Sequence, residues 1–158
     1  MKNPMKRLTV DASVCAGCRV CEMYCSFAHE KKFSPTISRV TVIKEEKHGM
    51  DYPIFCRQCT NCTAIEACPT DALYRTQEGI IQADLDICIS CGQCALKCKY
   101  NAVKMFEGQP LICDLCGGDP MCVKKCPTKA ISFIETDIFT EYPLEAFEVL
   151  KKRWKIDV

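Results

Sequence analysis

The stretch CISCGQCALKC, residues 88–98, places four cysteines within eleven residues. Its spacing is C-x2-C-x2-C-x3-C, where x stands for any residue. Three thiolates at this spacing lie on one tight loop and can bind three irons of a single cubane, while the fourth faces away and binds a neighbouring one. The stretch therefore predicts iron–sulfur clusters that are shared between this segment and another.

The 16 cysteines of this 158-residue chain fall into four groups of four, with none left over. The first and third groups share the x2, x2, x3 spacing, the second is spaced x2, x2, x5, and the fourth x2, x5, x3. Four complete sets of thiolate ligands predict four [4Fe–4S] clusters, because a [3Fe–4S] cluster would lack one thiolate. The groups are Cys15, Cys18, Cys21 and Cys25; Cys56, Cys59, Cys62 and Cys68; Cys88, Cys91, Cys94 and Cys98; and Cys113, Cys116, Cys122 and Cys126.

Zinc and disulfides explain the cysteines less well. Structural zinc prefers two separated C-x2-C pairs, whereas each group here offers a third cysteine nearby. Redox disulfides in C-x2-C motifs need a thioredoxin-like βαβ context, which none of the groups has. Iron–sulfur clusters remain the favoured interpretation.

Charge and apolar content indicate which partners and which cell compartment to expect. The net charge is +1, and no basic block suggests nucleic acid. No apolar stretch of about 18 residues predicts a membrane span, and the N-terminal MKNPMKRLTV contains no apolar run typical of a signal peptide. We therefore expect a cytoplasmic protein whose thiols are reduced or bound to metal.

A short motif recurs after three of the cysteine groups. PTDAL follows Cys68, KYNAV follows Cys98 and PTKAI follows Cys126, so an alanine and then an aliphatic residue come four and five positions after the cysteine. We expect a short helical turn that ends in a core residue, repeated because the unit was duplicated. SFAHE, after Cys25, breaks the pattern.

Elements between the groups are predicted to be short, which indicates an α+β fold. Strands are expected within residues 38–45, 80–84 and 102–106, where β-branched or apolar residues alternate. After Pro143, apolar side chains at helical spacing predict a C-terminal helix that either caps the protein's own clusters or anchors it to a partner. These side chains are Leu144, Phe147, Leu150 and Trp154.

Lys99 follows the third group where Pro69 and Pro127 follow the second and fourth. A lysine here either points into solvent or brings a positive charge close to a negatively charged cluster. In the second case Coulomb's law predicts easier reduction and a higher potential.

The chain resembles the multi-cluster ferredoxin-type electron-transfer subunits of molybdenum- and tungsten-pterin oxidoreductases, hydrogenases and formate dehydrogenases. The resemblance covers about residues 10–135 and rests on CAGCRVCEMYC, CRQC with CPTDAL, CISCGQCALKC, and CDLC with CVKKCPTKAI. The short length and missing membrane anchor look most like the small iron–sulfur subunits of soluble tungsten enzymes. These are of the aldehyde oxidoreductase type and include complexes that reduce benzoyl-CoA.

This resemblance implies a duplicated bacterial-ferredoxin-like fold of short hairpins and helices around four clusters. Residues 56–98 would form an inner two-cluster unit, residues 1–55 with 99–135 an outer one, and residues 136–158 a tail with a helix. The implied pairing is nested, although a tandem pairing, first group with second and third with fourth, uses the same ligands. Nested pairing joins Cys15, Cys18 and Cys21 with Cys126; Cys113, Cys116 and Cys122 with Cys25; Cys56, Cys59 and Cys62 with Cys98; and Cys88, Cys91 and Cys94 with Cys68.

The second group departs from the family pattern. The family's third cysteine usually lies four residues before the cysteine of the CP pair, and that position is Ala64 in this chain. We expect Cys62 to reach the same iron, because the loop length is kept.

The implied function is that of an electron relay and not of a catalyst. Clusters with complete thiolate ligation have no open iron for a substrate, and no G-x-G-x-x-G dinucleotide motif is present. The expected partners are a large tungsten- or molybdenum-pterin subunit and a flavin subunit, a soluble ferredoxin or further copies of the chain. The alternatives are a free-standing polyferredoxin, the iron–sulfur subunit of a hydrogenase or formate dehydrogenase, or, in a different class, a self-contained enzyme.

Overall fold

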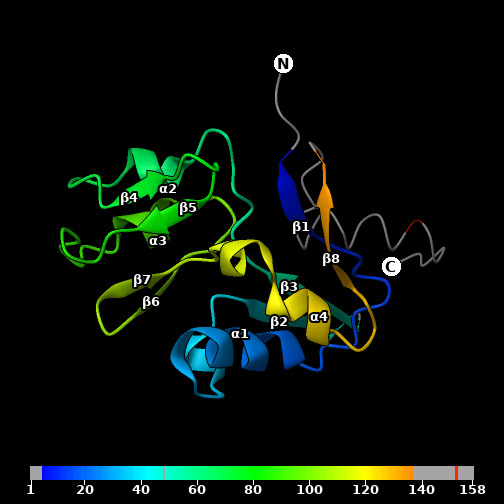
Figure 1. The fold of residues 1–158 in the computed structure, drawn as a ribbon. Coiled ribbons are helices and arrows are strands. Elements are labelled where there is room, and N and C mark those ends of the chain that lie inside the picture. Colours follow the sequence, from blue (N-terminus) through cyan, green and yellow to red (C-terminus); the bar gives the residue numbers. More distant parts are fainter. Residues whose placement is uncertain (1–4, 48, 137–151, 153–158) are drawn as a thin grey trace.

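Short antiparallel strand pairs and short helices make up the described part of the chain (Figure 1). The computed structural model describes residues 5–47, 49–136 and 152. The strands are β1 (Lys6–Val10), β2 (Thr41–Glu45), β3 (Met50–Ile54), β4 (Leu73–Arg75), β5 (Ile81–Ala83), β6 (Lys104–Phe106), β7 (Gln109–Leu111) and β8 (Ile131–Glu135). The helices are α1 (Val20–Glu30), α2 (Thr63–Glu66), α3 (Gln93–Lys97) and α4 (Met121–Lys125), with 3-10 turns η1 (Pro35–Ile37) and η2 (Leu115–Gly118).

Each strand pairs with a single antiparallel partner, giving β1–β8, β2–β3, β4–β5 and β6–β7 among the described residues. The β1–β8 pair joins the two ends of the described chain, with Lys6 opposite Glu135 and Val10 opposite Ile131. The strands expected within residues 38–45, 80–84 and 102–106 are confirmed as β2, β5 and β6, and so is the α+β class with short elements.

The repeat after the cysteine groups is a turn and not the helical turn that its sequence suggested. Asp71, Asn101 and Lys129 occupy the same place in the three copies, and each has a left-handed backbone, with φ of 55°, 51° and 58°. This conformation reverses the chain and leads it into an extended segment. The predicted core residues are nevertheless buried: Ala72, Leu73, Ala102, Val103, Ala130 and Ile131.

Helix α1 is the main element that the sequence did not reveal. It carries Cys21 and Cys25 on its buried face, together with the polar residues Glu22 and Ser26. The backbone N–H of Val42 donates to Glu22 at 2.6 Å, and the hydroxyl of Ser26 donates to the Met23 carbonyl at 2.8 Å. Polar residues on the buried face, and the absence of a side-chain N-cap at its first turn, conceal the helical pattern.

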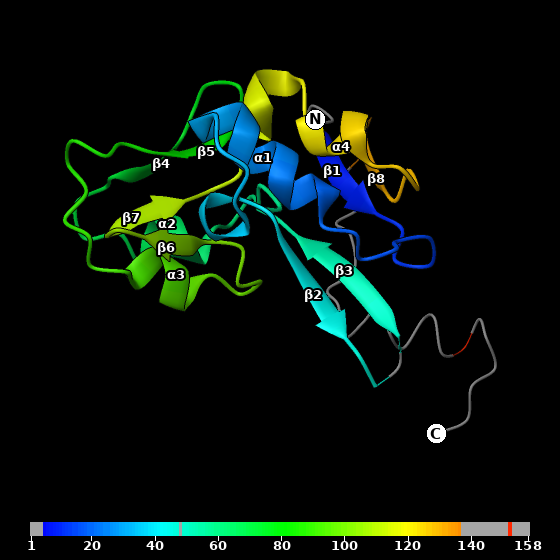
Figure 2. The same ribbon diagram turned by 90° about the horizontal axis from the view of Figure 1, so that it is seen from below.

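The elements gather into two halves (Figures 1 and 2). Helices α2 and α3 contact each other beside β4–β5, while α1 packs against α4, which in turn contacts β8. A core around Leu73 and Ile81 serves the first half, and it includes Val103 and Ile112 from either side of the β6–β7 hairpin. The predicted unit boundary at residues 98 and 99 stays a prediction, and the predicted C-terminal helix lies outside the described residues.

Candidate iron–sulfur sites

The fold brings the cysteines together in four sets, here named sites I to IV. Sites I, III and IV each line a cavity, and in site II burial and neighbouring charge mark the thiols as close to one another. Each set joins the first three cysteines of one sequence group with the fourth cysteine of another. Site I is Cys15, Cys18, Cys21 and Cys126; site II is Cys25, Cys113, Cys116 and Cys122; site III is Cys56, Cys59, Cys62 and Cys98; and site IV is Cys68, Cys88, Cys91 and Cys94.

A residue with a left-handed backbone conformation lies in the loop of every site. Gly17, Gln58, Ser90 and Leu115 each lie two positions after the first cysteine of their group, with φ between 53° and 58°. This backbone bends the C-x2-C segment back on itself, so that successive cysteines face the same side. In site I the position is a glycine, for which this conformation carries no steric cost.

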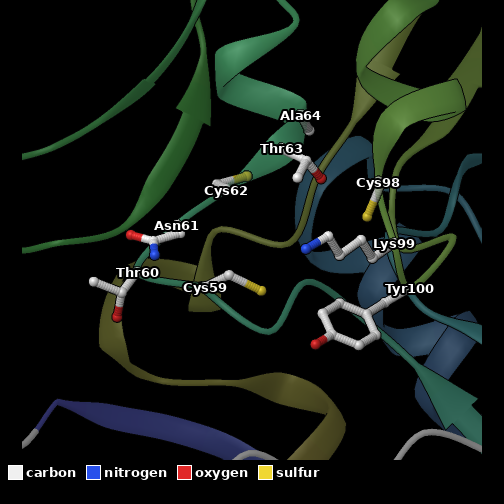
Figure 3. Close-up of a pocket in the computed structure, with 9 residues that line it drawn as sticks. All are labelled: Cys59, Thr60, Asn61, Cys62, Thr63, Ala64, Cys98, Lys99 and Tyr100. Carbon is white, nitrogen blue, oxygen red and sulfur yellow. The ribbon is translucent and has the colours of Figure 1, made fainter.

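Site III shows the arrangement of a cysteine cavity in detail (Figure 3). Its cavity of about 310 Å³ is lined by Cys59, Cys62 and Cys98, and Figure 3 shows the sulfur atoms of these residues facing the same space. Ala64 is buried in α2, and Cys62 precedes this helix at the cavity wall. The side chain of Lys99 also reaches into this space, with its amine among the sulfur atoms.

The sites are neighbours in the order I, II, III and IV, which is here called the line of sites. Cys21 of site I and Cys25, Cys113 and Cys122 of site II belong to one buried cluster, and Cys56 of site III packs against that cluster. Cysteines of sites III and IV share one core with Leu73 and Ile81. Cys18 in site I and Cys91 in site IV are the exposed cysteines of the chain, so the exposed thiols lie at the two ends of the line.

Burial makes the thiols poor anions unless a cation lies beside them. Burial raises the pKa of Cys21 and of Cys56 to about 12, and it raises the pKa of Cys113 well above its ordinary value. A bound metal reverses this preference, since it deprotonates its thiol ligands outright. Four thiols around one cavity therefore fit a group of several irons better than they fit free thiolates.

At Cys68 and Cys126 the pKa is lowered, because the hydrogen bonds to sulfur outweigh burial. Burial raises the pKa of each thiol, but backbone N–H groups outweigh it, chiefly those of Leu73 and Ile131, so both pKa values lie below the ordinary value. The hydroxyls of Thr70 and Thr128 lie 3.9 and 3.7 Å from these sulfur atoms. The repeated C-P-T sequence was a signal for these contacts.

Gln58 joins the two halves at the centre of the array, a role that no feature of the sequence indicated. Its side chain is 1% exposed. The amide nitrogen donates to the carbonyl of Cys113 at 2.7 Å, and the amide oxygen accepts from the N–H of Ile81 at 2.7 Å. One side chain thus ties site II to the core beside sites III and IV.

His29 lies between helix α1 and the loop of the fourth cysteine group, beside site II. Its Nε2 lies 2.9 Å from Oδ1 of Asp114, and its Nδ1 lies 2.9 Å from the carbonyl of Cys25. The same Asp114 oxygen accepts from the N–H of Cys116 at 3.0 Å. Helix α1 and the loop of the fourth cysteine group are held together through this contact.

Comparisons with known proteins agree with the chemistry of the sites. Residues 81–104 match the 4Fe-4S binding domain family. The polyferredoxin-like subunit of the aliphatic sulfonate oxidoreductase of Pyrococcus furiosus is 41% identical over 115 residues, which cover 71% of this chain and 66% of the relative, just under two thirds. The putative electron transport protein YsaA of Escherichia coli is 33% identical, over 82% of this chain and 90% of the relative.

A solved structure with a similar fold is the active site complex BamBC of benzoyl coenzyme A reductase with benzoyl-CoA. The matching chain has a TM-score of 0.51 and is 27% identical, with 95% of this chain and 91% of that chain covered. The matching family and the cysteines together indicate [4Fe–4S] clusters. Among the described residues, no helix has the length and apolar character needed to cross a membrane.

Proposed function

Because this chain belongs to the family of polyferredoxin-like iron–sulfur electron-transfer subunits of oxidoreductase complexes, we propose that it is an electron relay with four [4Fe–4S] clusters, one in each of sites I to IV. The observation that carries the proposal is the line of four cysteine sets that crosses the chain from one exposed end to the other. The nested pairing of the cysteine groups is part of the proposal.

The residues of this chain act by holding and insulating the clusters. A [4Fe–4S] cluster supplies one-electron oxidation and reduction when it is bound. Buried thiols at sites I and II keep water away, and backbone N–H groups at Cys68 and Cys126 donate to sulfur, which stabilises the more negative reduced state. All sixteen cysteines are used in holding clusters, and the proposed role is therefore electron transfer and not catalysis.

The proposed partner is a large catalytic subunit of the tungsten- or molybdenum-pterin type, close to the aldehyde oxidoreductases, in the cytoplasm. Likeness to a chain of the benzoyl coenzyme A reductase active site complex supports a catalytic partner. The complex isolated from native cells should contain tungsten or molybdenum and about sixteen irons per copy of this chain. Isolation as a single chain without a partner would favour a free-standing polyferredoxin.

Single cysteine variants distinguish nested from tandem pairing. Nested pairing places Cys68 with Cys88 in site IV, so Cys68→Ser and Cys88→Ser should alter the electron paramagnetic resonance signal of the same cluster and spare the other three. In the tandem pairing Cys68 would share a cluster with the first cysteine group. Signals altered differently by these two variants would reject the nested proposal.

Lys99 is expected to raise the potential of site III. Its amine lies among the sulfur atoms of this site, so Lys99→Met removes a positive charge that favours the reduced cluster. The midpoint potential of one cluster should fall by on the order of tens of mV, since solvent screens an exposed lysine. A redox titration followed by electron paramagnetic resonance measures this, with the exposed Lys97→Met on α3 as the control. Equal potentials in both variants would mean that Lys99 acts only as a solvated side chain.

A further inference from the structure

Site IV is surrounded by apolar side chains that solvent reaches. Leu85, Ile87, Ile89 and Leu96 are 47%, 47%, 60% and 77% exposed, and they come from twelve residues of the chain. Ile89 also lines the cavity of site IV. We name these four residues the site IV rim. They lie within six residues of the exposed Cys91 in the sequence, and Ile89 shares the site IV cavity with it.

Acidic residues flank the site IV rim. Asp84 and Asp86 are exposed, and they alternate in the sequence with Leu85 and Ile87 of the rim. Glu107 is exposed in the β6–β7 turn, and the next residue of that turn, Gly108, lies against Ser90, which belongs to the loop of the third cysteine group. Lys97 is the basic residue within residues 84–97. Two further lysines lie between Lys97 and Glu107, but Lys99 directs its amine into the site III space and Lys104 donates its amine to the Pro35 carbonyl at 2.8 Å. The border of the rim is therefore Asp84, Asp86 and Glu107 against Lys97, a net negative charge around an apolar centre.

An apolar centre with a charged border is the anatomy of a protein interface. Exposed apolar groups gathered in one place mark interaction sites, whereas scattered ones need no explanation. Here they coincide with the exposed cysteine at the end of the array, which is where an electron can leave the chain with the least protein in between.

We propose that the site IV rim docks a soluble electron-transfer protein whose docking face is apolar at its centre and basic at its border. The negative charge of Asp84, Asp86 and Glu107 selects the sign of that border, because complementary charge steers encounter and rejects partners of like charge. This inference rests on the proposed function, since it assigns one end of the relay to a partner.

The exchange at this surface transfers one electron and no proton. In the test reaction, the dithionite-reduced chain loses one electron and the ferric haem of cytochrome c gains it to become ferrous. Mitochondrial cytochrome c serves as the basic probe, and rubredoxin serves as an acidic one-electron probe of opposite surface charge.

Two measurements on the cluster-loaded full chain test the docking site. Calorimetric titration of the oxidised chain with oxidised cytochrome c measures binding without electron transfer, and stopped-flow spectroscopy measures the second-order rate of haem reduction. Asp84→Asn with Asp86→Asn, and separately Leu85→Gln with Leu96→Gln, should each weaken binding and slow reduction about three- to tenfold at low salt. The matched controls Glu30→Gln and Ile43→Gln replace an exposed acid and an exposed apolar residue elsewhere, and they should change neither.

The outcomes separate the docking site from the relay. A chain that holds its clusters and reduces both probes, but whose rim variants behave like the controls, overturns the docking site and leaves the relay intact. Faster reduction of rubredoxin than of cytochrome c through the same rim also overturns it. Self-association of the chain that Leu96→Gln abolishes, measured by ultracentrifugation, would identify a second copy as the occupant and overturn it too. Failure to bind iron, or to reduce either probe, defeats the relay and the docking site together.

Discussion

Removal of iron from the intact chain is expected to unfold most of residues 5–136. The strand pairs are two-stranded and the helices other than α1 have four or five residues, and elements of this size are not stable alone. Cysteines supply much of what core there is: Cys21, Cys25, Cys113 and Cys122 belong to one buried cluster, and five more pack against another. Metal binding then provides folding free energy, as in other small metallodomains.

Anaerobic treatment with an iron chelator, followed by circular dichroism and two-dimensional NMR, measures this effect. We expect loss of most secondary structure and collapse of the amide signals into a narrow range. Return of the spectrum after addition of ferrous iron and sulfide controls for chemical damage. A well-dispersed spectrum from the iron-free chain would show that the polypeptide folds by its own packing.

Gln58→Met is expected to be the most damaging substitution outside the cysteines. Methionine has a similar volume, but it leaves the carbonyl of Cys113 and the N–H of Ile81 buried without the amide that satisfies them. Each unsatisfied buried group costs about 1–3 kcal/mol, so the loss from both groups should be about 2–6 kcal/mol. For a domain of this size that lowers the melting temperature by about 5–15 °C.

The measurement is the temperature at which the visible absorbance of the clusters is lost under anaerobic conditions. Gln109→Met is the matched control, because Gln109 is exposed on β7. The Gln58 variant should also lose its clusters faster in guanidinium, since the two halves separate more easily. Equal melting temperatures for the two variants would exclude a joining role for Gln58.

The spacing of the cysteines was enough to divide them into four sequence groups, because spacing is local. Ligands two or three residues apart must share a loop, and the repeated C-P-T sequence already indicated that Cys68 and Cys126 have equivalent surroundings. Short strands such as β2 followed from alternation of β-branched residues. The nested grouping came from resemblance to a family, since spacing alone is equally satisfied by tandem pairing.

The features that the sequence did not predict depend on distant partners. Gln58 reaches residues 23 and 55 positions away, and nothing beside it in the chain indicates either contact. His29 likewise meets Asp114 across 85 positions. Helix α1 was hidden because Glu22 and Ser26 are polar yet buried, with hydrogen bonds that only the folded chain supplies.

The proposed nested pairing has a consequence for how the protein is made. Under this pairing sites III and IV need only residues 56–98, so their eight cysteines have all been synthesised while more than a third of the chain is still to come. Site I must wait for Cys126 and site II for Cys122, and strand β1 waits still longer for β8. The proposal therefore expects the earliest cysteines to leave the ribosome to be among the last to receive iron, and until then the cell has to keep Cys15, Cys18 and Cys21 reduced.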